Sequence, residues 1–284
     1  MVTWSGLRQG GSALVKVTVR NAVFQQWEAL LTNRNKRQRS GRFLIQGVRP
    51  ITLAVDNAWP LASLLRTQRR PLSGWAEHMV RRSGVEVVDV DADLLAELGE
   101  RDSGQPELIA VGELPPDDLN RLPAGPDFLG IVFDRPVSPG NVGTLIRSAD
   151  AFGASGVVVT GHAADIFDPK TIRATTGSLF ALPVVRAGST DEVVRWVRAR
   201  RSDGMAIRIL GTDEHGTAAI AECDLTQPTL LIVGNETAGM SARWREVCDD
   251  IVRIPIGGGA SSLNAANAGT VVLYEAARQR GFGC

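Results

Sequence analysis

Three short segments in the C-terminal half of the chain carry the polar side chains that could perform chemistry. Residues 134–143, 232–241 and 254–264 each place glycine beside a small amide, hydroxyl or carboxylate, after an apolar run and before a helical pattern. In an α/β sheet, loops at the carboxyl ends of strands open onto helix N-termini, and ligands bind there. Three such loops in one chain predict a single composite pocket.

The first segment has the residue types of an anion or hydroxyl site. Gly140 and Gly143 allow another group to approach the backbone closely, and Asn141 offers a donor and an acceptor at a helix start. Arg147 follows within that helix, and its guanidinium suits a phosphate, which it can bind through two parallel hydrogen bonds. The structural alternative is that Asn141 caps the helix and Arg147 is a surface cation.

The other two segments supply a carboxylate, a hydroxyl and an amide. Glu236 follows the apolar run 230–233 and can accept hydrogen bonds from a hydroxyl or from backbone N–H groups. Ser262 and Asn264 stand at the start of the last helical pattern. The alternative for all three is helix capping, which uses the same residue types.

Charge is divided unevenly along a chain whose formal net charge is zero. Residues 1–82 hold 14 Lys/Arg and 3 Asp/Glu, a formal charge of +11, whereas residues 83–284 hold 17 and 28, a formal charge of −11. A basic module joined to an acidic one favours a polyanion-binding domain, and nucleic acid in particular, over an ordinary solvated face. Residues 33–42 are predicted to form a basic turn. Its five cations are the candidate RNA contacts: Arg34, Lys36, Arg37, Arg39 and Arg42.

Several classes of protein are not expected from the composition. No apolar run approaches the ~18 residues of a membrane span, and the N-terminus lacks a signal-peptide pattern, so a cytoplasmic location is expected. The 3 Cys and 3 His are scattered and form no C-x-x-C, so neither a disulfide framework nor a metal site is expected.

The alternation of strand and helix patterns predicts an α/β protein of two domains. We expect a flexible N-terminal segment at 1–20, an RNA substrate-binding domain at 21–111, a proline-rich linker at 112–126 and a second domain at 127–284 with a mostly parallel sheet. Expected strands include 43–45, 61–65, 85–90, 128–133, 157–159, 207–210 and 229–233, and expected helices include 21–31, 92–98, 144–152, 192–200 and 264–280.

Taken together, the three segments resemble the motifs of the SpoU/TrmH-type family (SPOUT superfamily) of S-adenosylmethionine-dependent RNA ribose 2′-O-methyltransferases. The family's pattern is N-x-G-x-x-x-R, then G-N-E-x-x-G-[LM]-S, then I-P-[MI] followed by S-L-N. The matching residues are Asn141, Gly143 and Arg147; Gly234, Asn235, Glu236, Gly239 and Ser241; and Ile254, Pro255, Ser262, Leu263 and Asn264.

The resemblance implies a fold, a cofactor and residue roles. The C-terminal domain would form a deep trefoil knot that binds S-adenosyl-L-methionine, and the protein would be a homodimer with active sites at its interface. The implied cofactor-binding residues are Leu210, Gly211, Thr212, Gly234, Asn235, Ile254, Ile256 and Leu263. The implied catalytic residues are Asn141, Arg147, Glu236, Ser262 and Asn264.

The resemblance also extends to the N-terminal domain, which looks like the family's substrate-binding domain and, through it, like small ribosomal proteins. Residues 21–60 are most similar to members that methylate large-subunit (23S) rRNA and confer resistance to a ribosome-targeting antibiotic. The implied reaction is therefore 2′-O-methylation of a 23S rRNA nucleotide, favouring uridine. A tRNA ribose 2′-O-methyltransferase and a non-catalytic rRNA-binding assembly factor remain as alternatives, as does a housekeeping role.

Overall fold

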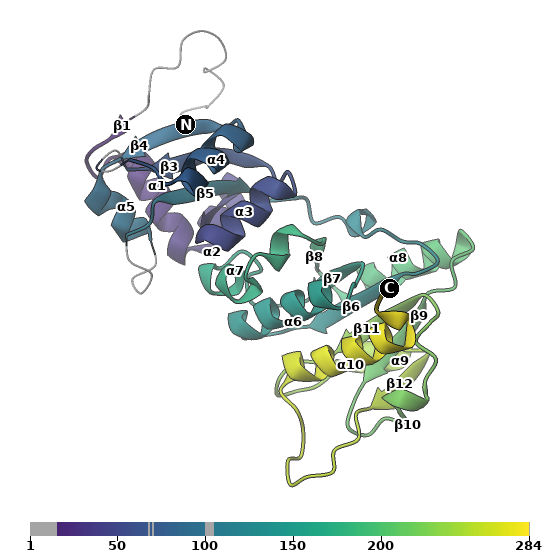
Figure 1. Ribbon diagram of the computed structural model, residues 1–284. Helices are drawn as coiled ribbons and strands as arrows, with labels where there is room; N and C mark the ends of the chain where they lie inside the picture. Colours follow the sequence, from purple (N-terminus) through teal and green to yellow (C-terminus); the bar gives the residue numbers. More distant parts are fainter. Residues whose placement is uncertain (1–15, 68, 70, 100–104, 284) are drawn as a thin grey trace.

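The computed structural model describes residues 16–67, 69, 71–99 and 105–283. Figure 1 shows two α/β units, one from the N-terminal part of the chain up to residue 113 and one from the remainder, each built on its own sheet. The α/β class and the mostly parallel C-terminal sheet, both expected from the sequence, are confirmed.

The N-terminal sheet has five strands in the order β1-β4-β3-β5-β2 among the described residues. The first three of these pair in parallel, and β5 is antiparallel to both of its neighbours. The strands are β1 (Lys16–Val17), β2 (Arg42–Gln46), β3 (Leu61–Arg66), β4 (Glu86–Val90) and β5 (Leu108–Glu113). The helices are α1 (Ala22–Thr32), α2 (Arg34–Ser40), α3 (Val48–Asp56), α4 (Gly74–Ser83) and α5 (Ala92–Leu98).

Two expectations for this unit were wrong. The basic turn at 33–42 is the helix α2, because the Asn33 side chain accepts from Lys36 N at its start and Gly41, at φ 65°, ends it in the left-handed conformation. Strand β1 lies within the segment expected to be flexible, and its two residues pair with Asp89 and Val90 of β4. Residues 1–15 of that segment lie outside the described residues.

The C-terminal sheet has seven parallel strands in the order β10-β12-β9-β11-β6-β7-β8. The strands are β6 (Leu129–Asp134), β7 (Gly156–Thr160), β8 (Val184–Ala187), β9 (Arg208–Thr212), β10 (Ala218–Ala219), β11 (Thr229–Val233) and β12 (Asp250–Arg253). The helices are α6 (Pro139–Ala151), α7 (Pro169–Thr175), α8 (Thr190–Ser202), α9 (Ala242–Val247) and α10 (Ala265–Gln279). Short 3-10 turns are η1 (Leu119–Arg121), η2 (Ser178–Phe180), η3 (Ile220–Glu222) and η4 (Gly281–Gly283).

Hydrophobic side chains fill both faces of this sheet. Alternate residues of the central strand β6 serve the two sides: Ile131 and Phe133 join the core under α6 and α10, and Val132 joins the core under α8 and α9. All of β6 and all of β11 are buried, as a parallel strand covered on both faces requires. Their carboxyl ends therefore meet at one edge of a rigid layer.

Helix boundaries in the C-terminal unit depend on capping signals that apolar periodicity does not show. Helix α6 begins at Pro139, five residues before the expected start at 144, because Ser138 caps it and proline is favoured in the first turn. A capping residue before proline also starts α7, where Asp168 precedes Pro169; this helix was not expected from the sequence. Strands β8 and β12 and helix α9 were also not expected.

Glycine lets the last helix approach α6 closely. A Cβ on Gly269 of α10 would stand 2.4 Å from Leu145 Cδ1, which is closer than packed atoms allow. Across the same contact, the hydroxyls of Ser148 and Thr270 are 2.7 Å apart. Close packing of a small-residue stripe on this helix was expected from the sequence, and it places the start of α10 beside the start of α6.

The two units contact one another through an aromatic cluster. The ring of Phe43 on β2 lies 4.8 Å from Phe167 and 6.3 Å from Phe180, and Trp59 packs edge-on against Phe180 at 5.1 Å, measured between ring centroids. Phe43 is completely buried. No helix in the described ranges is long and apolar enough to cross a membrane.

Candidate functional site

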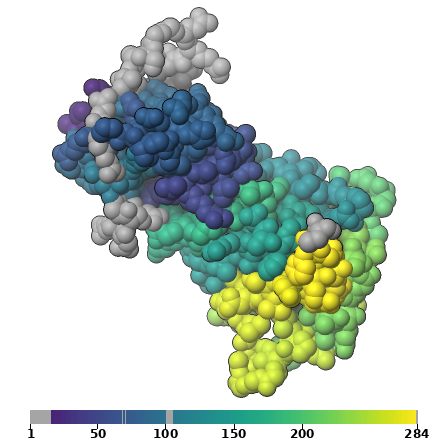
Figure 2. Space-filling model, viewed as in Figure 1, coloured from purple at the N-terminus to yellow at the C-terminus, as the bar shows by residue number. Residues whose placement is uncertain are grey.

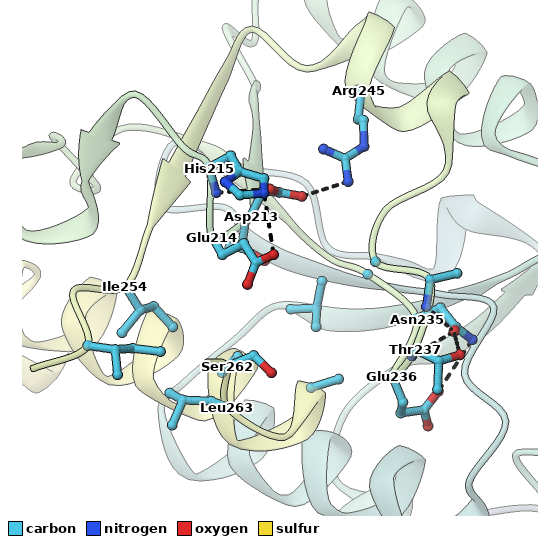
Figure 3. A pocket seen from close by; sticks show the side chains of 18 residues that line it. Asp213, Glu214, His215, Asn235, Glu236, Thr237, Arg245, Ile254, Ser262 and Leu263 are labelled. Carbon is cyan, nitrogen blue, oxygen red and sulfur yellow. Dashed lines mark hydrogen bonds and ion pairs between the residues drawn. The ribbon is translucent and has the colours of Figure 1, made fainter. Parts of the chain in front are cut away.

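The three polar segments meet at the carboxyl edge of the C-terminal sheet, around a cavity of about 350 Å³. Figure 2 shows that the molecular surface is hollowed between the yellow C-terminal segment and the green part of the chain. Figure 3 shows side chains from the β9, β11 and β12 loops and from the segment before α10 converging on this cavity. The composite pocket expected from the sequence is thus formed by the segments 232–241 and 254–264, with 134–143 joined to its rim.

Glu236 joins the second segment to the first. Its Oε1 accepts from Ser138 N and from Asn141 Nδ2, both at 3.1 Å, and its Oε2 accepts from Val137 N at 3.1 Å. The backbone donors belong to the turn that starts α6, where the helix dipole favours a negative charge. Glu236 therefore clamps the start of α6 to the end of β11.

The environment keeps Glu236 ionised. Burial alone raises the pKa of its carboxyl, but the hydrogen bonds from Asn141 and from the backbone of Val137 and Ser138 outweigh burial, so the pKa is lowered overall. A carboxylate whose oxygens are occupied by donors is a poor proton acceptor. Its geometry suits positioning better than general base chemistry.

Asn141 extends this connection to the third segment. Its Oδ1 accepts from Asn264 Nδ2 at 3.2 Å, while its own amide donates to Glu236. Asn264 is the N-cap of α10, and its Oδ1 accepts from the backbone N–H groups of Ala266 and Asn267. One hydrogen-bonded chain, Glu236–Asn141–Asn264, thus links all three segments, and capping and site roles coincide in the same residues.

A second set of bonds shapes the turn after β11. Asn235 donates to the Arg135 carbonyl at 2.7 Å, and its Oδ1 accepts from Thr237 N and Ala238 N at 3.0 Å. A Cβ on Gly234 would stand 2.3 Å from the backbone of Gly239 and Met240, so only glycine fits there. The spacing of Gly234, Asn235 and Gly239 thus follows from the backbone geometry of this turn.

Most of the expected cofactor residues line the cavity, and two do not. Those that line it are Thr212, Gly234, Asn235, Ile254, Ile256 and Leu263. Leu210 lies two residues before Thr212 in β9 and is fully buried, and Gly211 lies one residue before it and packs against Met240 and Cys248. Ile256 and Leu263 are each 39% exposed, leaving apolar surface for a ligand to cover.

Sequence reasoning missed four charged or polar residues at this cavity. Asp213, Glu214 and His215 follow β9 directly, and Arg245 on α9 forms an ion pair with Asp213 at 2.7 Å (Figure 3). The first three could have been found by applying to β9 the same carboxyl-end rule that identified the other loops. Arg245 gave no signal, since α9 itself was not expected.

The remaining expected catalytic residues, Ser262 and Arg147, differ in position. Ser262 is exposed and lines the cavity from the segment before α10. Arg147 is exposed on α6, six residues or about 9 Å along the helix from Asn141, and lines neither described cavity. Among the described residues it has no hydrogen-bond or ion-pair partner, so its guanidinium is available to an anion from outside this chain.

The expected RNA contacts include both exposed and buried cations, and the expectation for the buried one, Arg37, is corrected. Lys36 and Arg39 are exposed on α2, and Arg42 is half-buried at the start of β2. Arg37 is 1% exposed and forms an ion pair with Asp165 of the other unit at 2.7 Å, so it faces the domain interface and not RNA. Sequence position alone could not separate the two groups, because α2 turns Arg37 inward.

A second cavity, of about 550 Å³, lies where α2 meets the ends of β7 and β8. Arg34 lines it and donates to the Ala163 carbonyl at 2.7 Å, and Arg186 and His162 also line it. This hollow is at the same edge of the sheet as the first cavity. In the ranges that the structure describes, no group of three His, Cys, Asp or Glu side chains could hold a metal ion.

Comparison with known proteins places this arrangement in a family. Residues 129–274 match the SpoU rRNA Methylase family model, and residues 21–110 match the SpoU L30e-like domain model. The chain is 58% identical, over 93% of its length and 92% of the relative's, to a 23S rRNA (uridine(2479)-2′-O)-methyltransferase of Streptomyces viridochromogenes.

Two further matches extend the likeness. The crystal structure of the SpoU methyltransferase AviRb from Streptomyces viridochromogenes in complex with AdoMet superposes with a TM-score of 0.88 at 58% identity, covering 92% of this chain and 98% of that one. The 23S rRNA (guanosine(2553)-2′-O)-methyltransferase RlmP of Bacillus subtilis is 28% identical over 91% of this chain and 97% of its own.

Proposed function

This chain belongs to the SpoU rRNA methylase family, and we propose that it transfers a methyl group from S-adenosylmethionine to a ribose 2′-hydroxyl of 23S rRNA, at a uridine. The observation that carries the proposal is the Glu236–Asn141–Asn264 chain at the rim of the first cavity. It unites the three family motifs in one site, as an intact methyltransferase requires. Support for the substrate comes from the relatives, of which the more similar acts on uridine and the other on guanosine.

S-adenosylmethionine would occupy the 350 Å³ cavity, which its lining fits on two grounds. The apolar side chains of Ile254, Ile256 and Leu263 can cover the adenosine, and the ends of β9 and β11 expose backbone groups for hydrogen bonding. When bound, the cofactor supplies an electrophilic methyl group. The residues of this chain align the 2′-hydroxyl with it and hold the ribose in place.

We assign the motif residues as follows. Glu236 and Asn264 hold Asn141 at the start of α6, and Ser262 lines the cavity from the segment before α10. Arg147 would bind the phosphate beside the target ribose, because a guanidinium stays charged and binds phosphate through paired hydrogen bonds. Glu236 is not assigned as the base, since its lowered pKa and occupied oxygens oppose proton uptake.

The RNA would cross the carboxyl edge of the sheet from α2 towards the first cavity. Lys36 and Arg39 would contact phosphates of the RNA at the exposed face of α2. Arg34 and Arg186 would contact the RNA where it passes over the second cavity. Cytoplasmic rRNA as substrate would place the enzyme in the cytoplasm. The resistance role implied by the sequence depends on where the methyl group falls in the ribosome.

A homodimer is supported by an exposed apolar surface beside the site. Val137, Val271, Tyr274 and Phe282 are between 38% and 65% exposed. The ring of Tyr274 packs edge-on against Phe152 at 5.7 Å and lies tilted against Phe282 at 5.5 Å, measured between ring centroids. Such a patch on α10 and beside α6 would be covered by a second copy, next to Arg147. We also propose that the C-terminal unit forms a trefoil knot. The strand order, in which β12 lies between β9 and β10, is compatible with such a knot.

The test is to incubate the purified protein with radiolabelled S-adenosylmethionine and, separately, 23S rRNA, 16S rRNA and bulk tRNA. Label confined to 23S rRNA, in an alkali-resistant 2′-O-methyluridine, is the expected result. Label on tRNA would contradict the proposed substrate. Failure to bind the cofactor at all would contradict the enzymatic function.

A further inference from the structure

The interface between the two units contains a buried ion pair that the proposed chemistry does not use. Arg37 Nε and Nη2 lie 2.8 and 2.7 Å from Asp165 Oδ2, and Arg37 Nη1 donates to the Leu30 carbonyl at 2.6 Å. The side chains of Arg37 and Asp165 are 2% and 7% exposed. Arg37 belongs to the RNA-binding unit, and Asp165 to the loop between β7 and α7 of the methyltransferase unit.

Hydrogen bonds within its own unit hold the Asp165 carboxylate in this loop. Asp165 Oδ1 accepts from Phe167 N at 3.1 Å, and the Thr171 hydroxyl donates to the Asp165 carbonyl at 2.8 Å. Asp168, the cap of α7, lies 3.6 Å from Arg37 Nη2 and adds a second negative charge. The guanidinium therefore finds its partners in a fixed position.

The same loop is bonded to the active-site turn. Ala164 N donates to the Pro136 carbonyl at 2.7 Å, and Arg34 of α2 donates to the neighbouring Ala163 carbonyl. Pro136 directly precedes Val137 and Ser138, whose N–H groups donate to Glu236. A short series of hydrogen bonds thus runs from the basic helix α2 to the active-site carboxylate.

We propose that Arg37 and Asp165 are positioning residues for methyl transfer, because their ion pair fixes the angle at which the RNA-binding unit presents RNA to the catalytic loops. The inference rests on the proposed function. The aromatic cluster of Phe43 and Phe167 supplies apolar contact area, which is not directional. A buried ion pair adds little net stability but tolerates few geometries, so it selects one orientation.

The first test is Asp165→Asn, which keeps the shape of the side chain and removes its charge. We expect kcat on 23S rRNA to fall about 10-fold to 100-fold, since displacements of about 1 Å have that effect. The Kd for RNA should stay within about threefold, because Lys36 and Arg39 are untouched, and the stoichiometry of cofactor binding should not change. Arg37→Lys, which keeps the charge, should restore part of kcat in comparison with Arg37→Met.

Arg66→Met is the matched control, because it breaks a 2.8 Å ion pair with Asp89 inside the N-terminal unit and touches no interface residue. It should leave kcat unchanged. An Asp165→Asn enzyme with wild-type kcat would overturn the proposal. So would a weakened RNA affinity with a reduced salt slope in Arg37→Met, because that result would make Arg37 an RNA contact.

A measurement without RNA separates this proposal from the proposed function. Spin-label distances between exposed positions on α4 and α8 report the orientation of the two units. We expect a narrow distribution in the wild type and in Arg66→Met, and a broad one in Asp165→Asn. If the wild type methylates no rRNA, the proposed function fails, but the spin-label distances still test whether the ion pair sets the orientation of the two units. An unchanged distance distribution in Asp165→Asn would overturn the role proposed for the ion pair.

Discussion

Replacement of Asn141 tests whether the bridge between the three motifs is needed for turnover. Asn141→Ala removes two hydrogen bonds, one to the Glu236 carboxylate at 3.1 Å and one from Asn264 at 3.2 Å. A bond to a charged group contributes about 1.5–3 kcal/mol and a neutral one about 0.5–1.5 kcal/mol. Because the site is half-exposed, water replaces part of the hydrogen bonding that the variant loses. We therefore expect a loss of about 2 kcal/mol of interaction free energy.

If that loss falls on the transition state, kcat decreases about 30-fold. Asn141 does not line the cofactor cavity, so the Kd for S-adenosylmethionine should stay within about threefold. The assay is the initial rate of radiolabelled methyl transfer to 23S rRNA at saturating cofactor, with cofactor binding measured by calorimetry. A kcat within about threefold of the wild type would refute the reasoning, as would an equal loss of cofactor affinity.

Asn141→Asp gives the same perturbation a pH dependence. A second carboxylate would then lie beside Glu236, and two like charges at that distance raise the pKa of one of them. Below that raised pKa the pair shares a proton, which replaces the lost amide donor; above it the two groups repel. Activity relative to the wild type should therefore rise as the pH falls. A constant ratio across the pH range would contradict the bridge.

Three further changes test other parts of the structure. Arg147→Ala should abolish turnover and leave cofactor binding intact; turnover near the wild-type rate would remove Arg147 from the site. Lys36→Glu with Arg39→Glu should lower the slope of log K against log salt for RNA by about 2 while cofactor affinity is unchanged, and an unchanged slope would contradict their assignment. Gly269→Val should destabilise the protein by about 1–3 kcal/mol in thermal unfolding, because a Cβ there meets a leucine of α6 at 2.4 Å, whereas Gly258→Ala, with no atom within 4 Å, should not.

The sequence by itself determined the fold class, the three polar segments and their meeting at one sheet edge. Buried apolar runs such as β6 and β11 can only be covered parallel strands, and the polar residues after them must then share an edge. Strand ends and helix starts, which are local features, predicted Glu236, Asn141 and Asn264 as candidate site residues, and the structure joins their side chains by hydrogen bonds. Capping signals at Ser138 and Asp168 were also present in the sequence.

Tertiary structure alone decided which polar groups pair and which cations face solvent. Arg37 and Arg39 are two residues apart on one short helix, yet one is buried against Asp165, 128 residues away, and the other is exposed. No local pattern encodes that difference, because it depends on how the two units pack. The lowered pKa of Glu236 likewise depends on donors 95 or more residues away in the sequence, which only the closed arrangement of the loops brings within hydrogen-bonding distance.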